Sequence, residues 1–241
     1  MTVRAVLFDW EGTLARQGVE PGPAACAAVA EYAARNLGVD ARPADLERAF
    51  TAVLPHRSPS GGEGAPEIRG VLGQAFTWLG WPASAGDVEA AARLFFEAAS
   101  RGLQVFDDAR AVLASLKYRG YRAGVVTNSI FPADYWRPLV NSLGLAGYLE
   151  TFVSSADVGL AKPNPAPLRR ALADLGVPPH EAIFVGDTLA TDIAGARAAG
   201  LRAILLDRHG RRREAAGYLV IQRLSALADV LGEGLSPLAG P

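Results

Sequence analysis

Four short segments, far apart in the chain, carry the side chains best suited to chemistry. They are Asp9-Trp10-Glu11-Gly12-Thr13, Thr127-Asn128-Ser129, Ala161-Lys162-Pro163, and Gly186-Asp187-Thr188 followed by Asp192. The first, second and fourth directly follow apolar runs, and the carboxyl ends of parallel strands meet at one edge of a sheet. A carboxylate nucleophile, a hydroxyl and further acids at such an edge suit phosphoryl transfer through an aspartate. The spacing therefore predicts a reaction as well as a fold.

Apolar runs that alternate with helical patterns predict the elements that position these segments. Strands are expected at 4–8, 123–126, 151–153, 182–185 and 202–206, and 218–221 could add an edge strand. Helices are expected at 109–119, 133–143, 165–175 and 188–199, and each is followed by the glycine that commonly ends a helix. Strands joined by helices imply right-handed crossovers and a doubly wound, Rossmann-like parallel sheet of the α/β class.

Residues 15–102 interrupt this alternation. Amphipathic helices are expected there at 23–37, 43–54, 67–79 and from Ser84 to just before Gly102, with a capping box formed by Ser84 and Asp87. Residues 55–64 read as a polar loop, and Trp78 and Trp81 are expected to pack inside the bundle. We therefore expect a core domain of residues 1–14 and 103–241 and a helical-bundle cap domain of residues 15–102.

Composition limits the classes of protein that this chain can represent. Its 241 residues, half of them hydrophobic, suit one large domain or one domain with a modest insertion. The formal net charge of −1 offers no basic surface for nucleic acid or an anionic membrane. The single cysteine, Cys26, excludes an internal disulfide and a cysteine-based metal cluster. We expect a cytoplasmic protein without nucleic-acid or membrane partners, either a monomer or a homodimer.

In type and order, the four segments resemble the motifs of the haloacid dehalogenase-like (HAD) hydrolase superfamily, most members of which are magnesium-dependent phosphatases. The resemblance covers nearly the whole chain, including the helical cap inserted after the first strand. It implies that Asp9 is the nucleophile and Glu11 the general acid and base. It also implies that Thr127 and the backbone N–H of Asn128 bind phosphoryl oxygens, while Lys162 offsets their charge.

The resemblance further implies a metal site and a two-step reaction. Mg²⁺ prefers near-octahedral coordination by carboxylates, waters and substrate phosphate. The expected ligands are Asp9, Glu11 through its backbone carbonyl, Asp187 and Asp192. In the implied reaction, Asp9 forms an aspartyl-phosphate while Glu11 protonates the departing alcohol. Glu11 then deprotonates the water that clears the intermediate.

One residue departs from the family pattern: the usual second acid is Asp, and this chain has Glu11, which is one methylene longer. Members with Tyr at this place resemble dehalogenases, which need no metal, and the retained Lys162 and Asp187 argue against that activity. We expect a phosphatase acting on a small phosphorylated metabolite. The alternatives are a phosphomutase or phosphotransferase, and a regulatory or binding protein with weakened catalysis.

The inserted helices are expected to close over the sheet edge, exclude water and contact the leaving group. Candidate contacts for the part of the substrate beyond the phosphate are Arg16, His56 and Arg57. The identity of the substrate depends on the side chains of this cap and is not specified by the motifs.

Overall fold

The structure is a computed structural model and describes residues 2–17, 19, 22–54, 65–211 and 218–232. Within these ranges, a six-stranded sheet has the order β3-β2-β1-β4-β5-β6, and every pair of neighbours is parallel. The strands are β1 (Ala5–Phe8), β2 (Arg122–Thr127), β3 (Thr151–Ser154), β4 (Ala182–Gly186), β5 (Arg202–Leu206) and β6 (Leu219–Ile221). The expected doubly wound α/β sheet is confirmed, and β6 forms one edge.

The centre of the sheet is the pair formed by β1 and β4, in which Phe8 lies opposite Val185. From this pair the strand order runs outward through β2 and β3 on one side and through β5 and β6 on the other. The carboxyl ends of β1 and β4 therefore form the topological switch point, where α/β sheets place their ligand sites.

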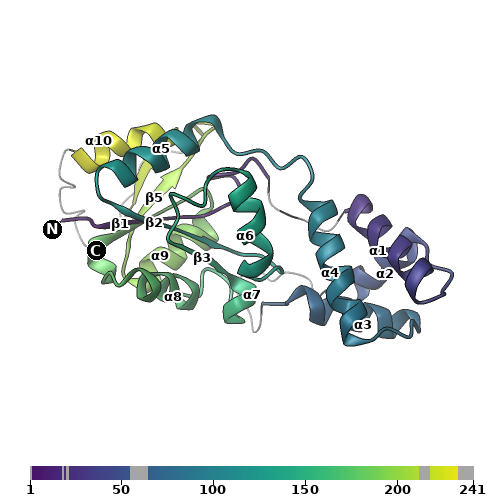
Figure 1. Cartoon of the computed structure of the whole chain (residues 1–241). Coiled ribbons are helices and arrows are strands. Elements are labelled where there is room, and N and C mark those ends of the chain that lie inside the picture. The colour runs from purple at the N-terminus through teal and green to yellow at the C-terminus, as the bar shows by residue number, and fades with distance from the viewer. Residues whose placement is uncertain (1, 18, 20–21, 55–64, 212–217, 233–241) are drawn as a thin grey trace.

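Helices cover both faces of this sheet (Figure 1). Val6 and Phe8 face the apolar cluster that contains α5 (Asp107–Tyr118), α6 (Ala133–Ser142) and α10 (Leu227–Gly232). Ala5 and Leu7 face the cluster that contains α8 (Ala166–Leu175) and α9 (Ala194–Ala199). Burial on both faces explains why β1 reads as a continuous apolar run. The same part of the chain also contains the short helix α7 (Ser155–Val158) and the short 3-10 helices η1 (Pro179–Glu181) and η3 (Leu224–Ala226).

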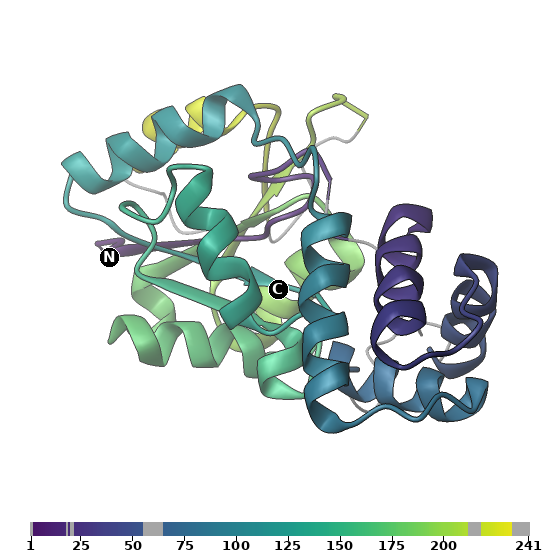
Figure 2. The same cartoon turned by 45° about the vertical axis from the view of Figure 1, so that its right-hand side comes forward.

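An insert of helices separates β1 from β2 and lies beyond the edge of the sheet where β1 ends (Figures 1 and 2). Its described helices are α1 (Pro23–Asn36), α2 (Pro43–Val53), α3 (Ile68–Leu79) and α4 (Ala85–Ala99). In both views α4 lies beside α6. The ring of Phe96 on α4 lies 5.0 Å from that of Phe131 and 5.4 Å from that of Trp136, measured between centroids. The domain boundaries expected from the sequence stay a prediction.

The two segments that connect the insert to the sheet run side by side. Ala15 and Val105 form an antiparallel bridge. The N–H of Arg16 donates to the carbonyl of Gln104 at 2.8 Å, and the N–H of Phe106 donates to the carbonyl of Leu14 at 2.9 Å. The chain therefore enters and leaves the insert through one short two-stranded link.

Two local expectations for the insert have different outcomes. The capping box is confirmed, because the N–H of Asp87 donates to Ser84 Oγ at 3.2 Å and the N–H of Ser84 donates to Asp87 Oδ2 at 2.9 Å. The expectation for Trp78 is wrong: it lies at the margin of the buried stripe of α3 and is 55% exposed. Trp81 is half-buried against Phe76. The expected loop at 55–64, with His56 and Arg57, lies outside the described residues.

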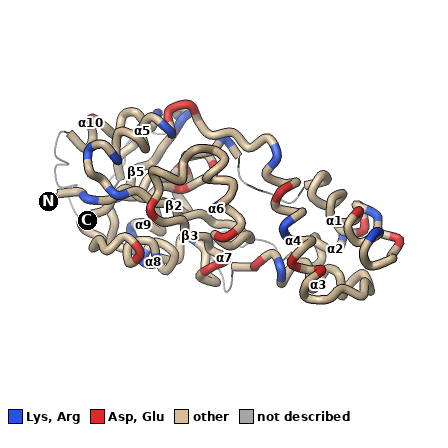
Figure 3. Tube along the Cα trace, viewed as in Figure 1, with Lys and Arg blue, Asp and Glu red and all other residues tan. Residues whose placement is uncertain are grey.

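Charged residues are spread over the whole described structure. Figure 3 shows acidic and basic residues interspersed both in the α/β part and in the inserted helices. In the described ranges, no helix has the length and apolar character that crossing a membrane requires.

Candidate active site

Three carboxylates meet at the switch point of the sheet. Asp9 directly follows β1, and its N–H donates to the carbonyl of Val185 in β4 at 2.9 Å. Asp187 directly follows β4. Carboxylate oxygens of Asp9, Asp187 and Asp192 all lie within 4.8 Å of one another. Asp9 and Asp192 are buried, whereas Asp187 is exposed, so the group is accessible from the Asp187 side.

The ammonium group of Lys162 lies between two of these carboxylates. Its Nζ donates to Asp9 Oδ1 at 2.6 Å and to Asp192 Oδ1 at 2.7 Å, and the residue is 2% exposed. The same Nζ lies 5.0 Å from the centre of the Phe184 ring. Burial lowers the pKa of this lysine, but the two carboxylates outweigh burial and raise it above its ordinary value. Lys162 is therefore a fixed positive charge at this site.

The segment after β2 reaches the same edge of the sheet. Thr127 is the last residue of β2 and is buried. Because Phe8 pairs with Val125, the register brings Thr127 to the edge at which Asp9 follows β1. The side chain of Asn128 accepts the N–H of Lys162 at 2.8 Å and donates to its carbonyl at 2.9 Å. The motifs indicated that the backbone N–H of Asn128 binds phosphate, but not that its side chain bonds to the backbone of Lys162. These two hydrogen bonds join segments that are distant in the chain.

Two glycines let the carboxylates lie against the backbone. Gly12 has φ +75°, and a Cβ atom there would overlap Oδ2 of Asp187. At Gly186, a Cβ atom would lie 2.5 Å from Cγ of Asp192. Any larger residue would displace the carboxylate beside it, so both glycines are needed for the carboxylates of Asp187 and Asp192 to lie where they do.

Asp192 reaches the cluster through a local change of helix type. The sequence predicts one helix over 188–199, whereas the chain forms a π-helical turn, η2 (Leu189–Ile193), before α9. The N–H of Ile193 donates to the carbonyl of Thr188 at 3.3 Å, and the N–H of Thr188 donates to Asp192 Oδ2 at 3.0 Å. The carboxylate of Asp192 thus turns back toward the end of β4. Such turns are frequent at functional sites.

The electrostatics of the cluster favour a bound cation. Burial raises the pKa of Asp9 to about 7, with Lys162 opposing and Asp192 adding to the rise. Burial also raises the pKa of Asp187, and Asp192 contributes. Close packing of three carboxyl groups disfavours their ionised forms, and a bound cation would relieve this; their hard oxygen donors fit a divalent cation such as Mg²⁺, Mn²⁺ or Ca²⁺. The residues present thus fit the metal that the motifs imply.

Glu11 lies on the turn that follows Asp9, and its side chain is exposed. Within the described residues, the carboxylate cluster comprises the three aspartates and not Glu11. The side chain of Arg16 contacts the link to the insert, 4.9 Å from the Phe106 ring and 3.7 Å from a carboxylate oxygen of Asp107. Arg16 therefore lies at the link, and these contacts do not place it among the cluster residues.

The fold and this cluster together define the class of protein. A model of the haloacid dehalogenase-like hydrolases matches residues 3–200, which run from just before β1 to the end of α9. The chain belongs to this family of hydrolases.

Individual relatives agree with this assignment. The phosphoglycolate phosphatase of Yersinia pseudotuberculosis is 32% identical over 216 residues, covering 84% of this chain and 80% of the relative. The phosphoserine phosphatase of Thermus thermophilus is 38% identical over 108 residues, covering 45% of this chain and 43% of the relative. Among solved structures, a 2-haloacid dehalogenase from Pseudomonas syringae has a TM-score of 0.68 and 27% identity, covering 96% of this chain and 99% of the other.

Proposed function

We propose that this protein is a magnesium-dependent phosphatase that hydrolyses the phosphate monoester of a small metabolite. The observation that carries the proposal is the position of Asp9 at the switch point. Its Oδ1 lies 2.6 Å from Nζ of Lys162, and its carboxylate belongs to one cluster with those of Asp187 and Asp192. The similarity to curated phosphatases over most of the chain supports the same activity.

The three aspartates, with the backbone carbonyl of Glu11, would hold the metal ion. When bound, Mg²⁺ supplies the positive charge that lets a carboxylate approach a phosphate dianion. The protein's own contribution is a group of oxygen donors held close together by the ends of β1 and β4 and by the turn η2.

In the first step, a carboxylate oxygen of Asp9 bonds to phosphorus and the ester P–O bond breaks. Glu11, in its protonated form, gives its proton to the departing alkoxide. In the second step, Glu11 takes a proton from a water molecule whose oxygen bonds to the same phosphorus, and the bond to Asp9 breaks. Inorganic phosphate leaves and both carboxyl groups return to their starting states.

Other residues bind and orient the phosphoryl group. Thr127 and the N–H of Asn128 would donate to its oxygens, and Lys162 would offset the negative charge that accumulates beside Asp9. The insert, which we propose to be a cap domain spanning residues 15–102, would exclude water during the first transfer and contact the leaving group.

The test is an assay of the full chain with p-nitrophenyl phosphate, phosphoglycolate, phosphoserine and a broad panel of other phosphorylated metabolites. We expect phosphate release that falls about 100-fold or more when EDTA removes divalent ions and returns with Mg²⁺. Absence of phosphate release from every compound would overturn the proposal. Chloride release from a 2-chloro acid would instead indicate a dehalogenase, and a new phosphate ester among the products a phosphotransferase.

A further inference from the structure

Arg208 lies two residues after the end of β5, and its guanidinium group contacts the turn that follows Asp9. Its Nη2 donates to the carbonyl of Thr13 at 2.8 Å, and its Nε donates to the carbonyl of Gly12 at 3.4 Å. The carboxylate of Asp108 accepts from Nη2 at 3.0 Å and from Nη1 at 3.2 Å. The arginine side chain is 17% exposed, so these bonds are largely protected from water.

The neighbours of Arg208 connect it to further segments. Asp108, in the first turn of α5, also accepts the N–H of Leu224 at 2.9 Å. Cζ of Arg208 lies 3.7 Å from the centre of the Phe106 ring, within the range of a cation–π interaction. Phe106 in turn bonds to Leu14 through its backbone. The guanidinium group therefore joins the turn after β1, the link to the insert and the start of α5.

The turn that Arg208 contacts is closed by its own backbone. The carbonyl of Trp10 accepts the N–H groups of Leu14 and Ala15, both at 2.9 Å, and the N–H of Gly12 donates to the carbonyl of Ala15 at 2.8 Å. The carbonyls of Gly12 and Thr13 bond to Arg208 instead. Since Glu11 is part of this turn, the position of its backbone depends on bonds that include those of Arg208.

We infer that Arg208 is a positioning residue, which holds the turn after Asp9 so that Glu11 is aligned with the leaving group. The inference rests on the proposed function and deepens it. A planar guanidinium group can bond to two carbonyls and one carboxylate at once, whereas the compact ammonium group of lysine cannot match this fork. Arg208→Lys keeps the positive charge and removes the planar set of N–H donors that bonds to Gly12, Thr13 and Asp108.

The matched control is Arg122→Lys. Arg122 also bonds to one carboxylate and one backbone carbonyl, those of Glu150 and Leu175, but it starts β2 and lies at the other end of the sheet. Each variant is assayed with a simple alkyl phosphate and with p-nitrophenyl phosphate. Only the alkyl alcohol, a poor leaving group, depends strongly on a general acid.

We expect Arg208→Lys to lower kcat on the alkyl phosphate about 10- to 100-fold, as a small misplacement of a reacting group does. The same variant should lower kcat on p-nitrophenyl phosphate much less and leave KM nearly unchanged for both. Arg122→Lys should leave the ratio of the two rates as it is in the unaltered protein. Equal losses on both substrates would show a merely structural role and overturn the inference.

A second measurement does not depend on activity. Hydrogen exchange of the amides between residues 10 and 16 should be faster in Arg208→Lys than in the unaltered protein and unchanged in Arg122→Lys. If Arg208→Lys does not fold, Asp108→Asn, which weakens the same group of bonds, should give the same result. An unaltered protein without phosphatase activity contradicts the proposed function, whereas unchanged exchange in this segment overturns the role of Arg208.

Discussion

Asp9 and Trp10 are consecutive residues whose side chains leave the end of β1 in opposite directions. The carboxylate of Asp9 joins the polar cluster, whereas the fully buried ring of Trp10 packs edge-on against Trp136 and Phe152, with centroid distances of 5.4 and 5.8 Å. The buried indole fixes the backbone at the point where the strand becomes a turn. The direction of the Asp9 carboxylate is thus set partly by an apolar contact on the other face of the sheet.

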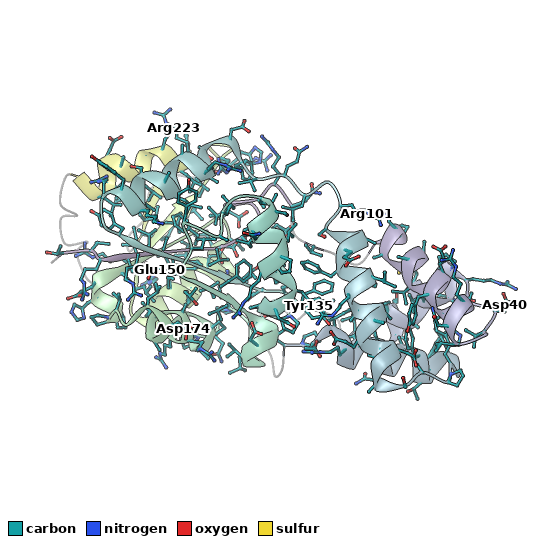
Figure 4. The ribbon with its side chains drawn as sticks, in the orientation of Figure 1. Asp40, Arg101, Tyr135, Glu150, Asp174 and Arg223 are labelled. Carbon is teal, nitrogen blue, oxygen red and sulfur yellow. The ribbon has the colours of Figure 1, made fainter. Side chains whose placement is uncertain are left out.

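Replacing Asp9 by Asn removes the proposed nucleophile and changes little else in shape. We expect Asp9→Asn to lower phosphate release from p-nitrophenyl phosphate about 1000-fold or more, as loss of a nucleophile does in other enzymes. Asp40→Asn serves as the control, because Asp40 lies at the far end of the insert (Figure 4) and its side chain is 85% exposed. Undiminished turnover in Asp9→Asn, measured with circular dichroism confirming the fold, would exclude Asp9 as the nucleophile.

Gly12 allows a prediction that separates backbone strain from the loss of the cluster. In Gly12→Ala, the new methyl group meets Oδ2 of Asp187 and the backbone has φ +75°. Gly38→Ala is the matched control, since Gly38 has φ +66° and nothing within 4 Å of an added Cβ.

Both variants should lose about 1–2 kcal/mol of unfolding free energy through the positive φ. Only Gly12→Ala should also lose phosphatase activity and affinity for Mg²⁺, measured by titration of the activity with the ion. Retained activity in Gly12→Ala would show that the Asp187 carboxylate can move without consequence.

Two of the three cluster aspartates could be predicted from strand ends, which are recognisable in an alternating α/β chain, whereas Asp192 lies inside η2 and was expected only from the family resemblance. Asp9 and Asp187 directly follow apolar runs, and parallel pairing brings such positions to one edge. The two hydrogen bonds between the Asn128 side chain and the Lys162 backbone could not be predicted, because they depend on how two loops lie against each other. Arg208 had a usable signal, since it too follows a strand, but Arg is common in this sequence.

The segment after β2 is supported by the short helix α7. The carbonyl of Ser129 accepts the hydroxyls of Ser154 at 3.2 Å and Ser155 at 3.0 Å. The carboxylate of Asp157 accepts the N–H of Ala133 at the start of α6 and the N–H of Ser154 at the start of α7, both at 3.1 Å. One carboxylate therefore caps two helices beside the proposed phosphate-binding segment.

Removing this shared cap should destabilise the protein more than removing an ordinary one. We expect Asp157→Ala to lower the free energy of unfolding by about 2 kcal/mol, because two backbone N–H groups lose a charged acceptor. Ser84→Ala, which removes the cap of α4 in the insert, is the comparison and should cost about 1 kcal/mol. Urea unfolding measures both, and a smaller effect for Asp157→Ala would contradict the shared cap.

The long helices were predictable because their apolar positions repeat over several turns, as in α1 and α5. The four residues of α7 are too few to show such a period, so this helix could not be seen in the sequence. The π-helical turn η2 has a different cause: its wider turn depends on the bonds between Thr188 and Asp192, which a periodic pattern does not record.

The insert packs on the α/β part through an apolar contact that charged residues border. Tyr135, which Figure 4 labels on α6, faces α4, and its hydroxyl lies 3.4 Å from Oε2 of Glu89. Arg93 and Arg69 pair with the same Glu89 carboxylate, at 2.6 and 3.4 Å. The N–H of Ile68, at the start of α3, also donates to the carbonyl of Ile130 at 2.8 Å. The start of α3 therefore touches the segment that follows Thr127.

For the described part of the insert, the sequence predicted helices α1–α4 and their order but not how they dock. Helix α4 has apolar residues that face the other inserted helices and apolar residues that face α6. The sequence does not distinguish these two sets, because a single residue can belong to both: Phe95 packs on Phe50 as well as on Phe131. A single cluster of buried apolar side chains consequently runs from the inserted helices to the face of β1 that carries Val6 and Phe8.

This shared cluster makes Cys26 a reporter of cooperative unfolding. Cys26 lies on α1 of the insert and is 2% exposed, and burial, with a smaller contribution from Glu47, raises the pKa of its thiol to about 11 from 9.0. The thiol of the folded protein therefore keeps its proton up to a higher pH than the thiol of the unfolded chain. This contribution to the free energy of unfolding is complete below about pH 9 and is lost as the pH rises through about 11.

At pH 8 the thiol of Cys26 should react with a disulfide reagent only after unfolding, because it is both inaccessible and protonated. Since insert and sheet share one cluster, the urea concentration that exposes the thiol should equal the midpoint of the loss of circular dichroism. Cys26→Ala, which has no thiol, gives the background of the reaction. Reaction at much lower urea would instead show that the inserted helices open while the sheet stays folded, and the cap would then be an independently unfolding unit.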